Sequence, residues 1–233
     1  MTPFCDYLNL TVPDAESGGL REALGLLLAG HGVREAFDRG HIYRLMEGTV
    51  RLGRRGQVLT IGVSGSAITV LRAAGLWGDL LSLFSEWPHR VTSLDVAYDR
   101  FDQAGADIVP GLNVLGKGGG VSLTRKGVDP RRVRMVDGLD PDGRLTGTVY
   151  LGARSAEVRC RVYDKRAERV DRGYSDPGNC VRYELTATSK VGISLRDAWD
   201  PAALFWHYMG RSLLESPPEV PSWVPAGEGF TMP

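Results

Sequence analysis

The segment "TVYLGARSAEVRCRVYDKRAE" (148–168) predicts a β-hairpin: a strand, a short polar turn after Gly152, and a second strand. The second strand alternates strictly between apolar and polar side chains. Its apolar face carries Val158, Cys160 and Val162, and its polar face carries Arg159, Arg161, Tyr163 and Lys165. Cations on both sides of one phenol predict a binding site for an anion, and a phosphodiester backbone is the obvious anion to fill it.

Two other strand-like segments extend this polar face with charged residues. They are Asp95 and Asp99 in "SLDVAYD" (93–99), which flank Ala97, and Arg182 and Glu184 in "VRYEL" (181–185). If these strands neighbour the hairpin, one surface holds a tyrosine, a lysine, arginines and three carboxylates. Because carboxylates are ligands that Mg²⁺ and Mn²⁺ prefer, the set predicts metal-assisted attack of a tyrosine on a phosphodiester.

A simpler explanation gives the same pattern. Charged residues on one face of an antiparallel strand are commonly the solvated side of a sheet. Cross-strand salt bridges between Arg159 or Arg161 and Glu184 would look identical in the sequence.

Three segments, in this order, resemble the replication initiation factor family of rolling-circle plasmids and filamentous phages, also called the trans-acting Rep family. They are "SLDVAYD" (93–99), "TVYLGARSAEVRCRVYDKRAE" (148–168) and "VRYELTA" (181–187). The most specific part is the hairpin with Gly-x-Arg-Ser followed by Tyr-x-Lys, and "CDYLNLTV" (5–12) resembles the usual opening strand. The resemblance covers about residues 5–215.

The resemblance implies a metal-dependent DNA nickase and strand transferase that forms a 5′-phosphotyrosine at a specific site and leaves a free 3′-hydroxyl. It implies Tyr163 as the nucleophile, with Lys165 as its neighbour in Tyr-x-Lys. The implied metal ligands, for Mg²⁺ or Mn²⁺, are Asp95, Asp99 and Glu184. The cations expected to contact DNA are Arg154, Arg159, Arg161, Arg182 and Lys117. The alternative function is a non-catalytic DNA-binding regulator on the same scaffold. The partner expected is replication-origin DNA, single-stranded or supercoiled, and a second copy of the chain and a host helicase are further candidates.

Composition and charge are compatible with selective contact to DNA. The chain has 233 residues, 42% of them hydrophobic, and a net charge of zero, which argues against a protein that coats nucleic acid indiscriminately. Residues 113–172 contain fourteen Lys/Arg and eight Asp/Glu, a net charge of +6. A locally basic patch on a neutral chain suits contact with one DNA site.

The cysteines and the hydropathy predict a cytoplasmic protein without a membrane partner. Cys5, Cys160 and Cys180 are odd in number and form no Cys-x-x-Cys pair, which indicates reduced thiols. No signal peptide opens the chain, and no apolar run approaches the roughly 18 to 20 residues that span a bilayer. The four histidines are scattered, which moves any metal site to carboxylates.

The element pattern predicts an α+β fold: a broad, mostly antiparallel sheet built from two related half-units, with helices on one face. Strands are expected at 5–12, 42–52, 58–62, 67–71, 91–99, 121–125, 132–136, 148–163 and 181–187, and helices at 15–28, 76–86 and, in one or two pieces, 194–215. Residues 111–118 lack the Ser/Thr that a P-loop needs after Lys117, so we expect a flexible loop there.

A duplication is suggested by the similar shapes of 58–71 and 148–163, and by intervals of 89 residues between Asp6, Asp95 and Glu184. We therefore divide the chain into residues 1–90, which position DNA, 91–215, which carry the chemistry, and a Pro-rich tail or linker at 216–233.

Overall fold

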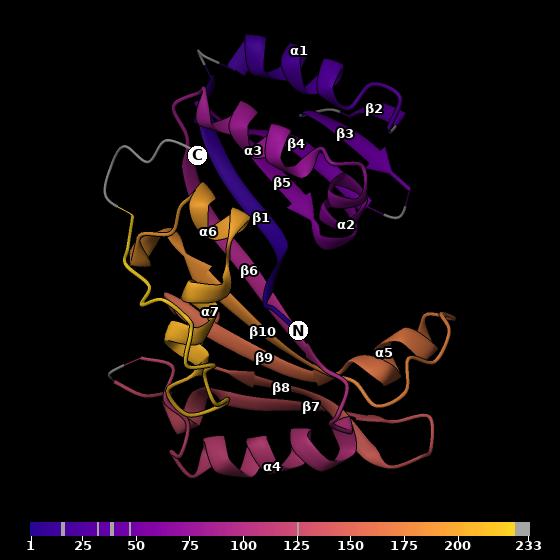
Figure 1. The fold of residues 1–233 in the computed structure, drawn as a ribbon, viewed down its shortest axis with the longest axis vertical. Coiled ribbons are helices and arrows are strands. Elements are labelled where there is room, and N and C mark those ends of the chain that lie inside the picture. The colour runs from indigo at the N-terminus through magenta and orange to yellow at the C-terminus, as the bar shows by residue number, and fades with distance from the viewer. Residues whose placement is uncertain (15–16, 32, 38–39, 47, 125, 227–233) are drawn as a thin grey trace. The chain divides into compact units, whose positions relative to one another are not determined.

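The structure, a computed structural model, describes residues 1–226 except 15–16, 32, 38–39, 47 and 125 (Figure 1). It has an α+β fold with mostly antiparallel strands. The strands are β1 (Phe4–Pro13), β2 (Val33–Phe37), β3 (Gly40–Leu45), β4 (Gly48–Arg55), β5 (Val58–Ser64), β6 (Arg90–Arg100), β7 (Val133–Leu139), β8 (Leu145–Leu151), β9 (Val158–Asp164) and β10 (Val181–Thr188). The helices are α1 (Ser17–Leu27), α2 (Gly65–Ala73), α3 (Trp77–Ser85), α4 (Gly105–Lys117), α5 (Lys165–Asp171), α6 (Leu195–Trp199) and α7 (Ala202–Met209).

The chain divides into two compact units. The amino-terminal unit comprises Cys5–Asp95, Thr188–Pro201 and the chain from Val224, and the carboxyl-terminal unit comprises Met1–Phe4, Val96–Ala187 and Ala202–Trp223. Strands of the first unit follow the order β2-β3-β4-β5-β1-β6, and those of the second follow β6-β10-β9-β8-β7. The boundary thus falls inside β6.

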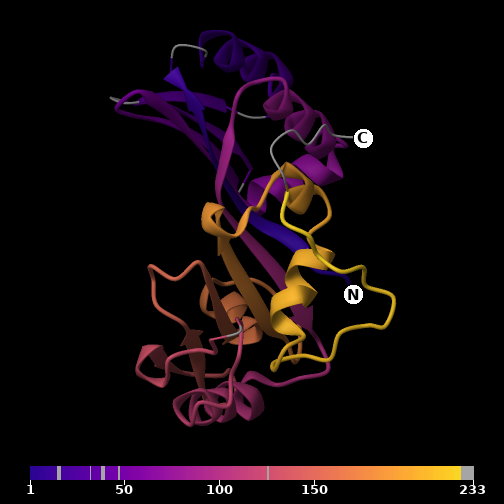
Figure 2. The ribbon, with the colours of Figure 1, turned by 90° about the vertical axis from the view of Figure 1, so that its left-hand side faces the viewer.

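In the amino-terminal unit the helices cover one face of the strands (Figure 2). α2 contacts β4 and β5, α3 packs on α2, and α1 packs on α3. Alternate residues of the paired strands β1 and β5 form the floor of this core, each at most 1% exposed: Leu8, Leu10, Val12, Leu59, Ile61 and Val63. Burial of this apolar stripe is the main stabilising contribution of the unit.

In the carboxyl-terminal unit, α4 lies along β8 and β7 (Figure 1), and α7 packs on β6 through Tyr98, Phe205 and Trp206. The strand face under these helices carries Val149, Leu151, Cys160, Val162, Tyr183 and Leu185, all buried. The opposite face of the same strands carries Arg161, Tyr163, Arg182 and Glu184. We call this opposite face the open face of the unit. The predicted alternation of β9 and β10 is confirmed.

Each half-unit has a strand, a helix, an antiparallel meander and a second helix in this order. The two orders are β1-α1-β2-β3-β4-β5-α2 and β6-α4-β7-β8-β9-α5, so the first meander has four strands and the second has three. The residue pairing behind the predicted duplication is wrong in part, since Ala67–Leu71 belongs to α2 rather than to a strand. The Ser64 hydroxyl accepts a hydrogen bond from the Ala67 backbone N–H and caps this helix. The apolar run that follows Ser64 had suggested a strand instead.

Helix α4 corrects the expected loop at 111–118. Its glycines made it look flexible, but two of them allow close packing. A Cβ on Gly116 would lie 3.1 Å from side-chain atoms of Leu151 and Val133, and a Cβ on Gly105 would collide with Asp164. The expected strand at 121–125 is also wrong, because residues 121–124 lie outside helices and strands.

Toward the end of the chain, the helix expected at 194–215 in one or two pieces is present as two helices, α6 and α7. Residues 216–226 lie outside helices and strands. Beyond α7, the Trp223 ring packs on His207 and Tyr208, with centroid distances of 5.2 and 5.8 Å. The chain up to Trp223 is therefore part of the carboxyl-terminal unit.

Candidate functional site

Tyr163 lies on the open face of β9, near the end of the predicted hairpin. It pairs in register with Thr148 of β8 and with Arg182 of β10. Lys165 lies outside the strand, because it is the first residue of α5. Arg161 and Lys165 approach the Tyr163 ring, with the guanidinium carbon 5.3 Å and the ammonium nitrogen 5.7 Å from its centroid. The predicted grouping of these three side chains is therefore present.

A pocket of about 250 Å³ opens beside this tyrosine. Its walls come from the β7–β8 hairpin, β9 and α5: Gly138, Leu139, Thr146, Gly147, Thr148, Arg161, Tyr163, Asp164, Ala167, Glu168 and Asp171. Tyr163 is only 7% exposed. Because the rest of the side chain is covered, this pocket is a route by which a ligand can reach the phenol.

Each cation close to Tyr163 has a carboxylate partner. Arg182 donates two hydrogen bonds to Asp99, at 2.6 and 2.8 Å. Arg161 donates one to Glu184, at 2.7 Å, and Lys165 forms an ion pair with Glu168. The simpler explanation of the charge pattern, a cross-strand salt bridge, is thus confirmed for Arg161 and Glu184.

The ionisation of Tyr163 follows from its burial. Burial raises the pKa of Tyr163 well above its usual value. Arg182 and Arg161 lower it, whereas Glu184 and Glu168 raise it, so the neighbouring charges partly cancel. The phenol therefore holds its proton at neutral pH, and any nucleophilic role needs a proton acceptor.

The predicted metal ligands do not fit a preformed metal site. Both oxygens of Asp99 accept hydrogen bonds from Arg182, and Glu184, which is 2% exposed, faces Arg161. A cation bound there would have to displace a guanidinium. Asp95 lies on β6 and influences the ionisation of Tyr7 and Cys5. Across the described part of the chain, no three His, Cys, Asp or Glu side chains are grouped closely enough to hold a metal ion.

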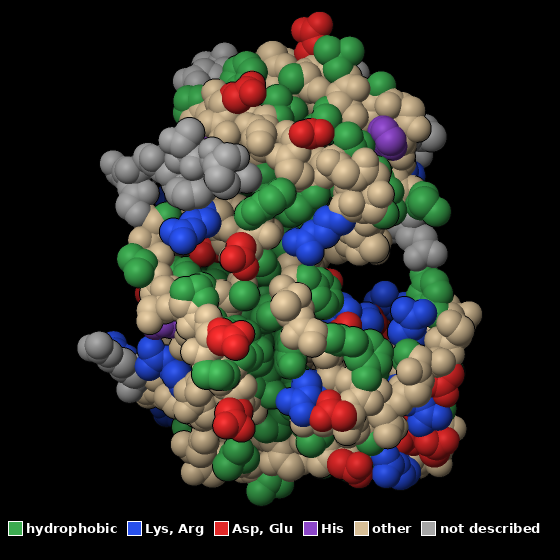
Figure 3. Space-filling model, in the orientation of Figure 1, with side chains coloured by type: hydrophobic (Ala, Val, Ile, Leu, Met, Phe, Trp, Pro, Cys, Tyr) green, Lys and Arg blue, Asp and Glu red, His purple; other side chains and the backbone are tan. Residues whose placement is uncertain are grey.

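The remaining predicted DNA contacts are spread over both faces of the unit. Arg154 is exposed in the turn between β8 and β9, and its carbonyl accepts a hydrogen bond from Arg159 at 2.9 Å. Lys117 ends α4, which covers the opposite face of the strands. In the view of Figure 3, basic side chains are interspersed with acidic ones rather than gathered into one patch. The open face therefore brings together Arg159, Arg161 and Arg182 but not Lys117.

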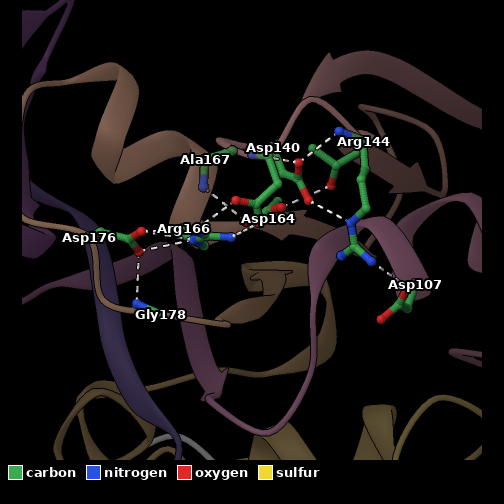
Figure 4. A network of polar contacts seen from close by, with 10 residues as sticks. Asp107, Asp140, Arg144, Asp164, Arg166, Ala167, Asp176 and Gly178 are labelled. Atoms are coloured by element: carbon green, nitrogen blue, oxygen red, sulfur yellow. Dashed lines mark hydrogen bonds and ion pairs between the residues drawn. The ribbon is translucent and has the colours of Figure 1, made fainter.

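A polar network that the sequence did not reveal holds the pocket walls together (Figure 4). Asp164 caps α5 by accepting a hydrogen bond from the Ala167 N–H at 2.9 Å, and it accepts another from Thr146 of β8 at 3.1 Å. Arg166 of α5 bridges Asp176 and Asp142. An aspartate directly before a helix predicts the cap formed by Asp164 from the sequence alone. The contact of Asp164 with Thr146 depends on the fold.

Asp140 anchors the turn of the β7–β8 hairpin, as its Asp-Pro-Asp-Gly sequence predicts. Its carboxylate accepts hydrogen bonds from the backbone N–H groups of Asp142 and Arg144, at 3.0 and 2.8 Å, and from the Arg144 side chain, at 3.0 Å. Burial raises the pKa of Asp140, but these hydrogen bonds outweigh it and lower the pKa overall.

Asp140→Ala should lower the melting temperature because the turn loses three hydrogen bonds. Since the folded-state pKa is lowered, the stabilisation is present above the carboxyl's unfolded pKa and is lost as the pH falls through the folded one. Thermal melts across acidic pH should therefore converge for the wild type and the variant. Asp137→Ala, an exposed position on the same hairpin, is the control, and an equal loss there would contradict the role of Asp140.

The fold has a known counterpart. No family model and no curated protein matches the chain. Among solved structures it is similar to a rolling circle replication initiator protein from Geobacillus stearothermophilus, with a TM-score of 0.54 and 20% sequence identity. The match covers 80% of this chain and 74% of that one. At this identity the likeness shows a shared fold.

The helices are short beside a membrane span, which needs about 20 apolar residues. Of those the structure describes, none is by itself long and apolar enough to cross a bilayer. α2 and α3 reach the required length and composition only together, and they are bent by 110° at their junction.

Proposed function

We propose that the chain is a replication initiator of the rolling-circle type, which nicks one DNA strand through Tyr163 and later rejoins it. The observation that carries the proposal is the position of this tyrosine on a pocket wall between Arg161 and Lys165. The shared fold with a rolling circle replication initiator protein and the Tyr-x-Lys resemblance support it.

In the proposed step, a carboxylate lining the pocket takes the phenol proton while the phenol oxygen forms a bond to phosphorus. The bond between phosphorus and the 3′ oxygen breaks. This oxygen takes up the proton from the carboxyl group, relayed through water, so a free 3′-hydroxyl leaves and the 5′ end stays on Tyr163 as a phosphotyrosine. Glu168 and Asp171 line the pocket and are the candidate acceptors. Arg161 and Arg182 would stabilise the extra negative charge on phosphorus.

Dependence on Mg²⁺ or Mn²⁺ is a separate proposal, which rests on the family resemblance and requires a cation to displace the arginines that pair with Asp99 and Glu184. The experiment incubates the chain with single-stranded and supercoiled DNA of its own replicon and detects the covalent adduct on a denaturing gel. If a metal takes part, excess EDTA should remove the adduct and Mn²⁺ should restore it. Adduct formation at full rate in EDTA would end the metal proposal and leave the charge stabilisation to the arginines.

A second candidate, a DNA-binding regulator without chemistry, is favoured by the burial of Tyr163 and by its paired cations. The same experiment separates the two functions. Binding to origin DNA with no adduct under any metal condition would support the regulator.

A further inference from the structure

The amino-terminal unit has a second polar sheet face, opposite the one that its helices cover. It carries Tyr7, Asn9 and Thr11 of β1, Thr60 and Gly62 of β5, Thr49, Arg51 and Gly53 of β4, and Arg44 of β3. We call this face the platform. Arg44 and Arg51 on this face are exposed, and Gly62, opposite Arg51, has no side chain.

The strand register places the polar groups of the platform in one row. Arg51 is opposite Gly62, and Gly62 is opposite Asn9 on the next strand. A Cβ on Gly62 would lie 2.8 Å from the Tyr7 hydroxyl and 3.1 Å from the Asn9 side-chain oxygen. The Tyr7 phenol therefore lies over the backbone of β5 at Gly62, and a side chain at position 62 would collide with its hydroxyl.

The surroundings of Tyr7 favour the protonated, neutral phenol. Tyr7 is partly buried, and this burial raises the pKa of its phenol. Asp95 raises the pKa further, whereas Arg51 lowers it, so both charges lie near the ring. Asn9 donates a hydrogen bond to Ser93 at 3.0 Å, which fixes the amide beside the ring. The row thus presents, in order, a cation, an aromatic group and an amide.

We propose that the platform binds unpaired nucleotides of single-stranded DNA, a role that rests on the proposed function and extends it to a second site. A base stacks on Tyr7, the Asn9 amide meets the base edge, and Arg51 and Arg44 neutralise the flanking phosphates. Single strands fit better than a duplex because a stacking ring needs a base whose face is open.

The test measures fluorescence anisotropy of a labelled single-stranded oligonucleotide with the full chain carrying Tyr163→Phe, so that no covalent product forms. Tyr7→Leu should weaken binding about tenfold because the base loses its stacking ring. Arg51→Gln should weaken binding by about the same factor because a phosphate loses its counter-charge. Tyr7→Phe, which keeps the ring, should bind nearly as well as the parent. Arg72→Gln changes an exposed cation on the helix-covered side and is the matched control.

Unchanged affinity in both Tyr7→Leu and Arg51→Gln, or an equal loss in Arg72→Gln, would overturn the platform. So would a duplex that binds more tightly than the single strand. Arg51 is exposed, so Arg51→Gln keeps the test valid if Tyr7→Leu does not fold. Nicking is tested separately, by adduct formation in the chain with Tyr163 intact. If that chain forms no adduct while Tyr7→Leu and Arg51→Gln still weaken binding, the nickase proposal alone is rejected.

Discussion

Tyr163→Phe is expected to reduce the covalent protein–DNA adduct to background while leaving binding of the same DNA within a few-fold. The change removes one hydroxyl and keeps the ring that packs beside Arg161 and Lys165. Loss of the adduct would thus reflect loss of the nucleophile rather than of the fold. The adduct is read on a denaturing gel, and mass spectrometry of the digested protein locates the modified residue.

Tyr150→Phe is the matched control for this experiment. Tyr150 lies on the neighbouring strand β8, opposite Arg161 in register, with the Arg134 guanidinium 4.6 Å from its ring centroid. It should retain full activity. An adduct that persists in Tyr163→Phe and maps to Tyr150 or Tyr183 would move the nucleophile to that residue.

The wild-type rate of adduct formation should rise as the pH is raised from neutral toward alkaline values. Because burial raises the pKa of Tyr163, the phenol is protonated at neutral pH and needs the carboxylate as proton acceptor. A higher pH increases the fraction of phenolate, which reacts without that acceptor. A rate that falls with increasing pH would contradict a neutral phenol as the resting state.

Gly105→Ala is expected to destabilise the chain by roughly 1–3 kcal/mol, the usual cost of overpacking a close contact. The new methyl group would collide with the Asp164 side chain, which caps α5 and accepts a hydrogen bond from Thr146. Since Asp164 lines the pocket, the variant should also lose adduct formation. Chemical denaturation measures the first effect, and the gel assay measures the second.

Gly111→Ala, in the same helix, should have the opposite effect on stability. A Cβ at this position would meet nothing within 4 Å, and alanine is favoured over glycine in a helix interior by roughly 0.5–1 kcal/mol. If residues 111–118 were the loop that the sequence suggested, Gly111→Ala would gain no stability from helix propensity. Equal and small effects at both positions would therefore contradict α4 as described.

The helices show where sequence patterns fail. The stripe of Leu20 and Leu24 predicts α1 because helical periodicity is visible within a dozen residues. α4 was missed because Pro110 and its glycines are poor helix formers by themselves. Packing on β7 and β8 overrides that propensity, and the glycine at 116 is favourable there because it leaves room for Leu151 and Val133.

Charged residues likewise show that local sequence patterns do not reveal tertiary contacts. The sequence identified Asp99 and Glu184 as acidic residues on open strand faces, and the structure places them there. It offered a salt bridge between Arg161 and Glu184 only as an alternative, and it did not pair Asp99 with Arg182. That pairing depends on which residues the register sets opposite one another across strands far apart in the chain.

The sequence by itself determined which side chains share a face in β6, β9 and β10, because alternation along a strand is a local property of extended backbone. It thereby placed Tyr163 with Arg161, whereas the pairing of β9 with β10 brings Arg182 beside them. Only the tertiary structure decided that Tyr163 is buried on a pocket wall, that its neighbouring cations are paired, and that Glu168 and Asp171 line the same pocket. Burial and pairing arise from contacts between residues distant in sequence, and these contacts set the ionisation on which the proposed chemistry depends.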